Sequence, residues 1–181
     1  MQPYVVLLRG VNVGGKNTLP MAGLKQCLEE LGFSNVSTYI ASGNVILQSD
    51  KQPAEIEELI EKTLVRSFKL DSELIEVLAL TRRQLQAVIG DRPPGFGDQP
   101  EVYHSDAIFL IGITAAEAMT VFSPREGVDK VWPGNGVIYS QRLSAERTKS
   151  RLGRIVGTPV YKSMTIRSWN TTRKLLELLS A

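Results

Sequence analysis

The stretch Ser42-Gly43-Asn44-Val45-Ile46 returns later in the chain as Pro133-Gly134-Asn135-Gly136-Val137-Ile138. Glycine and asparagine are favoured in tight hairpin turns, and the apolar residues that follow are typical of the start of a strand. A second correspondence precedes each stretch, because Leu7-Leu8-Arg9-Gly10 resembles Leu110-Ile111-Gly112. Both pairs stand at matching points of the expected strands, so the sequence predicts that one structural unit occurs twice.

The first half alternates between strand and helix signals. Continuous apolar runs indicate buried strands, apolar residues at helical spacing indicate amphipathic helices, and Gly and Pro mark the ends of both. The expected order is a strand, a helix, two strands, a helix, a strand and a further helix, at residues 4–9, 20–31, 36–40, 45–48, 54–69, 74–80 and 82–89.

The second half repeats this order after a connector at residues 91–105 that is rich in Gly and Pro. Its expected strands and helices lie at residues 107–111, 115–122, 128–132, 137–140, 150–156, 163–167 and 170–179. A strand-helix-strand-strand-helix-strand unit is the ferredoxin-like arrangement. We therefore expect an α+β protein in which two ferredoxin-like (βαββαβ) units with antiparallel sheets occur in tandem, at residues 1–90 and 106–181.

The composition is that of a folded protein without disulfides. Of the 181 residues, 43% are hydrophobic and 22% are charged, which is typical of globular proteins. There is no stretch of about 18 apolar residues that could span a membrane, and residues 1–4 lack the layout of a secretory signal. The single Cys and the single His exclude disulfides and any zinc site built from Cys and His. We expect a cytoplasmic protein with no metal and no cofactor.

The charge is unevenly distributed along the chain. Residues 140–181 hold nine Lys and Arg against two acidic residues, a net charge of +7, while residues 1–139 carry a net charge of −5. On the expected helix, Arg147, Arg151 and Arg154 would share one face at spacings of four and three. A solvated basic face explains this pattern, and weak electrostatic binding of nucleic acid through the same residues is an alternative.

The segment from Gly10 to Asn17 nearly matches the phosphate loop of nucleotide hydrolases, which reads glycine, four residues, Gly-Lys and then Ser or Thr. Asn17 replaces the hydroxyl residue, and Pro20 indicates that the helix begins after the lysine. A glycine-rich turn with a solvated Lys16 explains the segment equally well. A nucleotide-dependent hydrolase or transferase that uses residues 10–17 is one alternative, and anion binding without catalysis is another.

Three other segments carry candidate functional residues. Ser42 and Asn44 belong to the first hairpin turn, which by itself explains the presence of Gly and Asn. His104 lies in the expected connector, so we assign it no catalytic role. Between the last strand and the last helix, Trp169 offers a stacking face or a core anchor, and Arg167 and Asn170 offer hydrogen-bond donors. Ser168 or Asn170 is placed to cap the helix.

The leading hypothesis is a binding protein for a small ligand that carries a phosphate or a carboxylate, with no catalytic residue assigned. The expected ligand-binding residues are Arg9, Asn12, Gly14, Gly15, Lys16, Ser42, Asn44, Arg167, Trp169 and Asn170. In one ferredoxin-like unit we expect the end of the first strand and the second hairpin to lie at opposite edges of the sheet. The loop 10–17 and the turn at Ser42 would then meet only through packing between the halves or through bending.

The chain resembles the bacterial domain of unknown function 1697 family over nearly its whole length. The resemblance rests on three segments: Leu8-Arg9-Gly10-Val11-Asn12-Val13-Gly14-Gly15-Lys16-Asn17, Thr38-Tyr39-Ile40-Ala41-Ser42-Gly43-Asn44-Val45, and Thr165-Ile166-Arg167-Ser168-Trp169-Asn170-Thr171. It implies two ferredoxin-like subdomains and no established activity. The last motif usually reads Arg-Asn-Trp-Asn-Thr in this family, so Ser168 is a departure that removes a side-chain amide.

Overall fold

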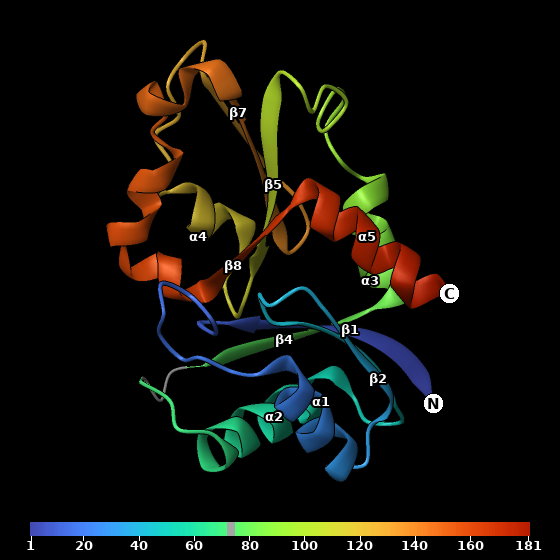
Figure 1. The fold of residues 1–181 in the computed structure, drawn as a ribbon. Coiled ribbons are helices and arrows are strands. Elements are labelled where there is room, and N and C mark those ends of the chain that lie inside the picture. The colour runs from blue at the N-terminus through green and yellow to red at the C-terminus, as the bar shows by residue number, and fades with distance from the viewer. Residues whose placement is uncertain (72–74) are drawn as a thin grey trace. The chain divides into compact units, whose positions relative to one another are not determined.

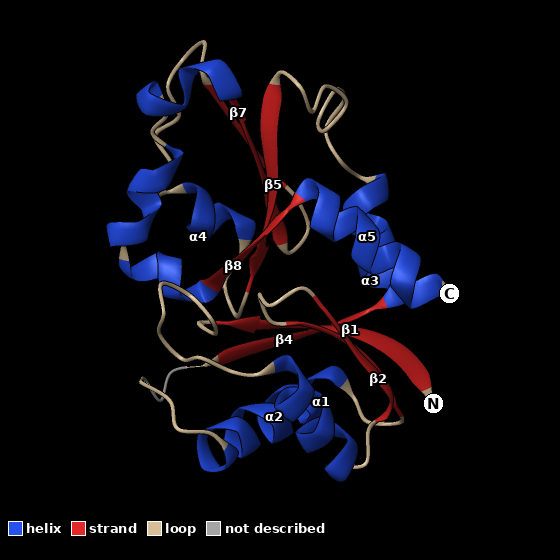
Figure 2. Ribbon diagram, viewed as in Figure 1, coloured by secondary structure: helices blue, strands red, loops and turns tan. Residues whose placement is uncertain are grey.

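The computed structural model describes residues 1–71 and 75–181, which form two compact units (Figure 1). The first unit comprises Met1–Gln86 together with Lys174–Ala181, and the second comprises Ala87–Arg173. From the sequence we expected subdomains at residues 1–90 and 106–181, with the whole C-terminal helix in the second. In the structure, residues 174–181 of that helix group with the first unit. Each unit combines a sheet with helices (Figure 2).

The first unit contains a four-stranded sheet in the order β2-β3-β1-β4, and every pairing in it is antiparallel. Its elements are β1 (Gln2–Arg9), α1 (Met21–Glu30), β2 (Ser34–Tyr39), β3 (Asn44–Ser49), α2 (Pro53–Ser67) and β4 (Glu76–Thr81). Helix α3 (Arg82–Gly90) follows, and the boundary between the two units falls within it. The strand expected at 74–80 begins at Leu74, which lies outside the described residues.

The core of the first unit lies between its sheet and the helices α1 and α2, which cover one side of the sheet (Figure 1). Alternate residues of β1, namely Tyr4, Val6 and Leu8, belong to this core. Val5 and Leu7, which point to the opposite face, are also completely buried. A strand that is buried on both faces needs apolar side chains throughout, and this explains the unbroken apolar run in its sequence.

The edge strand β4 is shielded by two glutamates of α2. The backbone N–H of Ala79 donates to Glu57 Oε1 over 2.9 Å, and that of Val77 donates to Glu61 Oε1 over 3.0 Å. Unpaired backbone groups of an edge strand otherwise invite pairing with another chain. Burial raises the pKa of both carboxyl groups, while these hydrogen bonds act in the opposite direction.

The second unit contains another four-stranded antiparallel sheet, in the order β6-β7-β5-β8. Its elements are β5 (Tyr103–Leu110), α4 (Ala115–Met119), β6 (Asp129–Pro133), β7 (Val137–Leu143), the 3₁₀ helices η1 (Ser144–Lys149), η2 (Leu152–Gly157) and η3 (Pro159–Ser163), β8 (Met164–Ser168) and α5 (Trp169–Ser180). Ile108, Ile138 and Met164 form a core with Ala118 of α4. The protein is therefore a mixed α and β protein with two antiparallel sheets, which agrees with the expected α+β class.

Direct pairing of β1 with β3 corrects one expectation. Leu7 of β1 lies opposite Asn44, the first residue of β3. The end of β1 and the β2–β3 turn therefore lie at the same end of neighbouring strands. The expectation that they occupy opposite edges was wrong, because it overlooked that the first and third strands of this arrangement are neighbours.

The helix expected at 150–156 is a 3₁₀ helix, η2, which follows η1 with Ser150 and Arg151 between them. Their hydrogen bonds span three residues, as from Arg154 N–H to the Arg151 carbonyl at 3.1 Å, and Glu146 interrupts η1 with non-helical angles. Gly153 and Gly157 disfavour a longer α-helix here. Arg147, Arg151 and Arg154 consequently do not share one α-helical face.

The connector is shorter than the sequence indicated, because β5 begins at Tyr103. His104, which we placed in the connector, is a strand residue that pairs with Arg142 of β7. The strand signal was hidden by its polar first half, Tyr103–Asp106.

Helix α3 begins at the expected residue, and Thr81 Oγ1 caps it by accepting the N–H of Gln84 at 3.2 Å. Among the described residues, no helix has the length and apolar character needed to cross a bilayer.

Candidate functional site

The loop after β1 ends in a tight two-residue turn. Gly14 and Gly15 both have positive φ angles, 56° and 75°, as the central residues of a type I′ turn require. The N–H of Lys16 donates to the Val13 carbonyl at 2.9 Å, and these two residues form an antiparallel bridge. The turn presents Val13 and Lys16 to solvent.

Two asparagines brace this loop from inside. The side chain of Asn12 accepts the N–H of Leu19 at 2.7 Å and donates to the Leu19 carbonyl at 3.1 Å. Asn17 donates its side-chain amide to the Gly10 carbonyl at 2.8 Å, and its backbone N–H is bound by Asp71 Oδ2 at 2.7 Å. Both residues adopt positive φ angles, which asparagine tolerates better than most residues.

The loop therefore differs from a phosphate loop in two respects. The backbone N–H groups of Asn12, Lys16 and Asn17 are bound within the first unit instead of pointing at one empty centre. Helix α1 begins at Met21, after Lys16, and its N-terminus is not capped by a side chain. The near-match in sequence thus reflects a braced turn, and the geometry gives the nucleotide-hydrolase alternative no support.

The turn between β2 and β3 packs directly against this loop. Asn12 Nδ2 donates to the Ala41 carbonyl at 2.7 Å. A Cβ atom on Gly43 would lie 2.7 Å from Val11 Cγ2 and 2.9 Å from the Leu8 carbonyl oxygen, so only glycine fits. Asn12 is thus brought into contact with the turn that holds Ser42, while Gly14, Gly15 and Lys16 lie further along the same loop.

Ser42 and Asn44 are occupied within their own turn. Asn44 is fully buried, and its side-chain amide donates to the Tyr39 carbonyl and to Ser42 Oγ, both at 3.1 Å. Arg9 is half-buried at the end of β1, opposite Glu76 of β4. Of the residues expected to bind a ligand in the first unit, Gly14, Gly15 and Lys16 are exposed along with Ser42.

Two of the expected residues of the second unit are buried. Arg167 Nη1 donates to Thr165 Oγ1 at 2.8 Å and to the Ile166 carbonyl at 2.9 Å, and burial lowers the pKa of its guanidinium to about 10. Trp169 is 5% exposed and packs edge-to-face on Phe96, with ring centres 5.0 Å apart. Phe96 makes the same kind of contact with Tyr139 at 5.2 Å. Trp169 is therefore largely a core anchor.

A small pocket opens beside Trp169, where α5 begins. It has a volume of about 140 Å³, and we call it the α5 pocket. Its lining residues are Gly97, Pro100, Tyr103, His104, Ser105, Ser168, Trp169 and Asn170. Because β8 ends at Ser168, opposite Asp106, the first turn of α5 takes the place of a strand beside residues 103–105.

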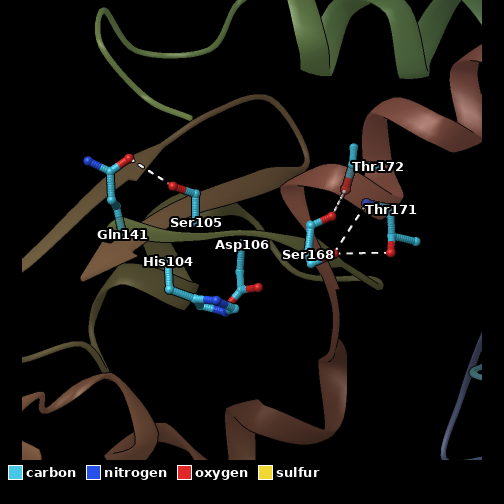
Figure 3. A network of polar contacts seen from close by, with 7 residues as sticks. All are labelled: His104, Ser105, Asp106, Gln141, Ser168, Thr171 and Thr172. Atoms are coloured by element: carbon cyan, nitrogen blue, oxygen red, sulfur yellow. Dashed lines mark hydrogen bonds and ion pairs between the residues drawn. The ribbon is translucent and has the colours of Figure 1, made fainter. Parts of the chain in front are cut away.

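Ser168 caps α5, which was one of the two caps expected. Its Oγ accepts the N–H of Thr171 at 3.2 Å and donates to Thr171 Oγ1 at 3.0 Å, while its carbonyl accepts the Thr172 hydroxyl at 2.9 Å (Figure 3). Asparagine, the usual residue of the family motif at this position, is an equally good capping residue. The departure at Ser168 therefore preserves the cap.

His104 is the residue of this site that the sequence argument missed. Its Nε2 lies 3.0 Å from Asp106 Oδ2, and Figure 3 shows both side chains on one side of β5, with Ser105 on the other. Ser105 donates its hydroxyl to Gln141 Oε1 at 2.9 Å. The spacing of two between His104 and Asp106 would have revealed the pair, had the strand been expected to start at Tyr103.

The carboxyl group of Asp106 is half-buried beside the α5 pocket, next to His104. Burial raises its pKa, while the nearby charges of His104 and Arg142 and the hydrogen bond with His104 act in the opposite direction. Titratable groups perturbed by burial beside a pocket are typical of binding and catalytic sites. Within residues 1–71 and 75–181, no group of three or more His, Cys, Asp or Glu side chains is arranged to hold a metal ion.

The structure thus places the expected site residues in two groups. Residues of the loop 10–17 lie with Ser42 and Asn44 in the first unit, and Trp169 and Asn170 line the α5 pocket in the second. Arg167 is not among the lining residues of that pocket.

Comparison with protein families places the chain in a known group. The model of the family described as "Protein of unknown function (DUF1697)" matches residues 1–139, and the chain belongs to this family. Among solved structures, it is similar to the conserved bacterial protein SP0830 from Streptococcus pneumoniae, at 26% identity and a TM-score of 0.80 over 98% of both chains. A comparison with curated proteins gives no match.

Proposed function

We propose that this protein binds a small ligand carrying a phosphate or carboxylate in the α5 pocket of its second unit. One observation carries the proposal: His104, held by Asp106, lines a pocket that also includes the first turn of α5. This proposal keeps the ligand class expected from the sequence and retains Trp169 and Asn170 as ligand contacts. It does not use the loop 10–17.

The chemistry of the pocket suits an anion of a few heavy atoms. A water molecule occupies about 30 Å³ of liquid, so a volume of about 140 Å³ admits a phosphate or a short carboxylate. The N-terminus of α5 favours negative charge. His104 and the hydroxyl group of Tyr103 add hydrogen-bond donors. The Trp169 ring and Pro100 supply apolar walls.

Titration with inorganic phosphate and with acetate tests this function. The indole N–H signal of Trp169 in a ¹H–¹⁵N spectrum reports directly on the α5 pocket. We expect one of the two anions to shift this signal in a saturable way, and we expect His104→Gln to weaken binding about tenfold, the effect of losing one charge-assisted hydrogen bond. Gln99→Ala, at an exposed position outside the lining, should bind as the wild type does.

Two outcomes would contradict the proposal. One is a Trp169 indole signal that neither anion moves. The other is equal affinity in the wild type and in His104→Gln, with the fold of the variant checked by its full spectrum. A rise in melting temperature with ligand concentration is a supporting readout, because a ligand of the native state stabilises it.

We also propose that the two sheets are ferredoxin-like units related by tandem duplication. The support is the equivalent strand order, β2-β3-β1-β4 against β6-β7-β5-β8, with all pairings antiparallel. The matching sequences at the two hairpin turns agree with this interpretation. A cytoplasmic location is proposed on the single, half-buried Cys27, since disulfides form in oxidising compartments and one Cys allows none within the chain.

A further inference from the structure

The second unit contains a cluster of charged and polar side chains beside strands β6 and β7. None of its residues lines the α5 pocket. It comprises Arg125, Asp129, Arg142, Ser150 and Arg151, and we call it the Asp129 cluster. Asp129 begins β6 directly opposite Arg142 of β7. The backbone N–H of Arg151 donates to Asp129 Oδ2 at 2.8 Å, which brings the start of η2 to the same carboxylate.

The carboxylate of Asp129 accepts three hydrogen bonds, and none of these donors is a guanidinium group. Its Oδ1 accepts the Ser150 hydroxyl at 2.7 Å, and its Oδ2 accepts the backbone N–H groups of Arg125 at 2.9 Å and Arg151 at 2.8 Å. Although burial raises the pKa of Asp129, these hydrogen bonds and the charge of Arg142 hold it below the usual value. Asp129 therefore stays ionised, and its hydrogen bonds do not engage the guanidinium groups of the cluster.

Arg142 and Arg151 keep unused hydrogen-bonding capacity. The Nε atoms of both are buried and have no hydrogen-bond partner in the described part of the chain. Lys149, by contrast, is paired with Glu146 at 2.8 Å. A buried donor without a partner costs free energy, so such a group calls for an additional acceptor.

We infer that Arg142 and Arg151 together bind one phosphate group. Two guanidinium groups with free donors match the several acceptor oxygens of a phosphate, and arginine binds such groups through parallel hydrogen bonds. The local charge supports this assignment, because Arg125, Arg142 and Arg151 outnumber the two carboxyl groups on which Arg142 acts, Asp106 and Asp129. The phosphate can belong to free inorganic phosphate or to a nucleic-acid backbone.

The Nε–H signals of Arg142 and Arg151 in a ¹H–¹⁵N spectrum test this inference. Each signal is assigned from its loss in Arg142→Gln or Arg151→Gln. On titration with inorganic phosphate, we expect both signals to shift with one shared dissociation constant. Each substitution should weaken binding about tenfold. Arg154→Gln removes an exposed positive charge from the same segment and should leave the constant unchanged.

Arg151→Lys separates hydrogen-bond geometry from charge. Lysine keeps the positive charge but lacks the planar fork, so we expect Arg151→Lys to bind almost as weakly as Arg151→Gln. Nε–H signals that do not move at millimolar phosphate would overturn the inference, and so would a loss of affinity in Arg154→Gln equal to that in Arg151→Gln. Thermal unfolding of each variant verifies that it is folded.

A short single-stranded oligonucleotide identifies the source of the phosphate. If the site takes a nucleic-acid backbone, the oligonucleotide shifts the same two signals, and the logarithm of its affinity falls with log salt with a slope of about −0.7 for one phosphate. If it takes free phosphate, only inorganic phosphate shifts them. Asn170→Ala alters the α5 pocket alone, so phosphate binding at Arg142 and Arg151 should survive it even if the proposed function fails.

Discussion

The side-chain amide of Asn12 donates to the carbonyl oxygen of Ala41 over 2.7 Å and thereby ties the loop 10–17 to the β2–β3 turn. The two segments are far apart in the sequence, but both follow from the pairing of β1 with β3. The glycines of the loop lie beyond this brace, at the exposed turn. The loop is consequently rigid at its base, with only its tip available for contacts.

Asn12→Ala should destabilise the first unit by about 2 to 4 kcal/mol, because it removes three hydrogen bonds, two of them partly buried. Asn35→Ala is the matched control, since Asn35 also has a positive φ but is exposed. We expect it to cost about 1 kcal/mol from backbone strain alone. Chemical denaturation measures both values, and equal losses would show that the brace contributes nothing.

Gly97→Ala should disrupt the aromatic core beside the α5 pocket. Gly97 has a φ of 76°, and an added Cβ would lie 2.5 Å from Trp169 Nε1. Strain and overpacking together predict a loss of about 3 to 5 kcal/mol, with a change in Trp fluorescence.

The control for this substitution is Gly112→Ala, which has a similar φ of 71° but no atom within 4 Å of the added Cβ. It should cost only about 1 to 2 kcal/mol. If both variants lose the same stability, the close approach of Gly97 to Trp169 is not what requires glycine.

Glu57→Gln should change how stability depends on pH. The folded-state pKa of Glu57 is raised, so the ionised side chain costs stability once the pH rises through that value. Glutamine still accepts the Ala79 N–H but does not ionise. We therefore expect Glu57→Gln to gain stability relative to the wild type as pH rises above the ordinary Glu range.

Glu58→Gln should show the opposite slope, because the hydrogen bond and the charge of Lys62 lower the pKa of Glu58. Its ionised form stabilises the protein above the ordinary Glu range, and this contribution is lost as pH falls through the lowered pKa. Unfolding curves at several pH values compare the two variants. If the stability difference from the wild type changes with pH in the same direction for both variants, the assigned environment of Glu57 is wrong.

Ser168→Ala should destabilise the protein by about 1 kcal/mol, the usual cost of losing an N-cap. Ser168→Asn restores the residue of the family motif and should differ from the wild type by only a few tenths of a kcal/mol. Thermal or chemical unfolding of the three proteins checks this order. An Ala variant as stable as the wild type would mean that the bond from Thr171 N–H is not important for α5.

Lys16→Ala should leave any background hydrolysis of ATP or GTP unchanged. The backbone N–H groups of Asn12, Lys16 and Asn17 are bound within the first unit, so they are not available to hold a phosphate. Incubation with nucleotide and magnesium, with product quantified for both proteins, is the measurement. Hydrolysis by the wild type that disappears in Lys16→Ala would revive the nucleotide-hydrolase alternative.

Local patterns in the sequence were sufficient to predict the α+β class and most element positions. The apolar run Tyr4–Leu8 and the glycines of both hairpin turns each act through neighbouring residues. Such signals need no knowledge of the rest of the fold. Where they were weak, the prediction missed the strand start at Tyr103–Asp106 and did not foresee that the helix at 150–156 is a 3₁₀ helix, because polar strands and 3₁₀ turns lack a clear apolar period.

The tertiary structure alone decided which of the candidate residues lie together. Strand order placed Asn12 beside Ala41, and the early end of β8 opened a pocket between His104 and Asn170. It also buried Arg167 and set Arg142 opposite Asp129. These contacts join residues distant in sequence, and each depends on which strands pair and in which register. The period of a single strand carries no information about its partner, so no local pattern could have predicted them.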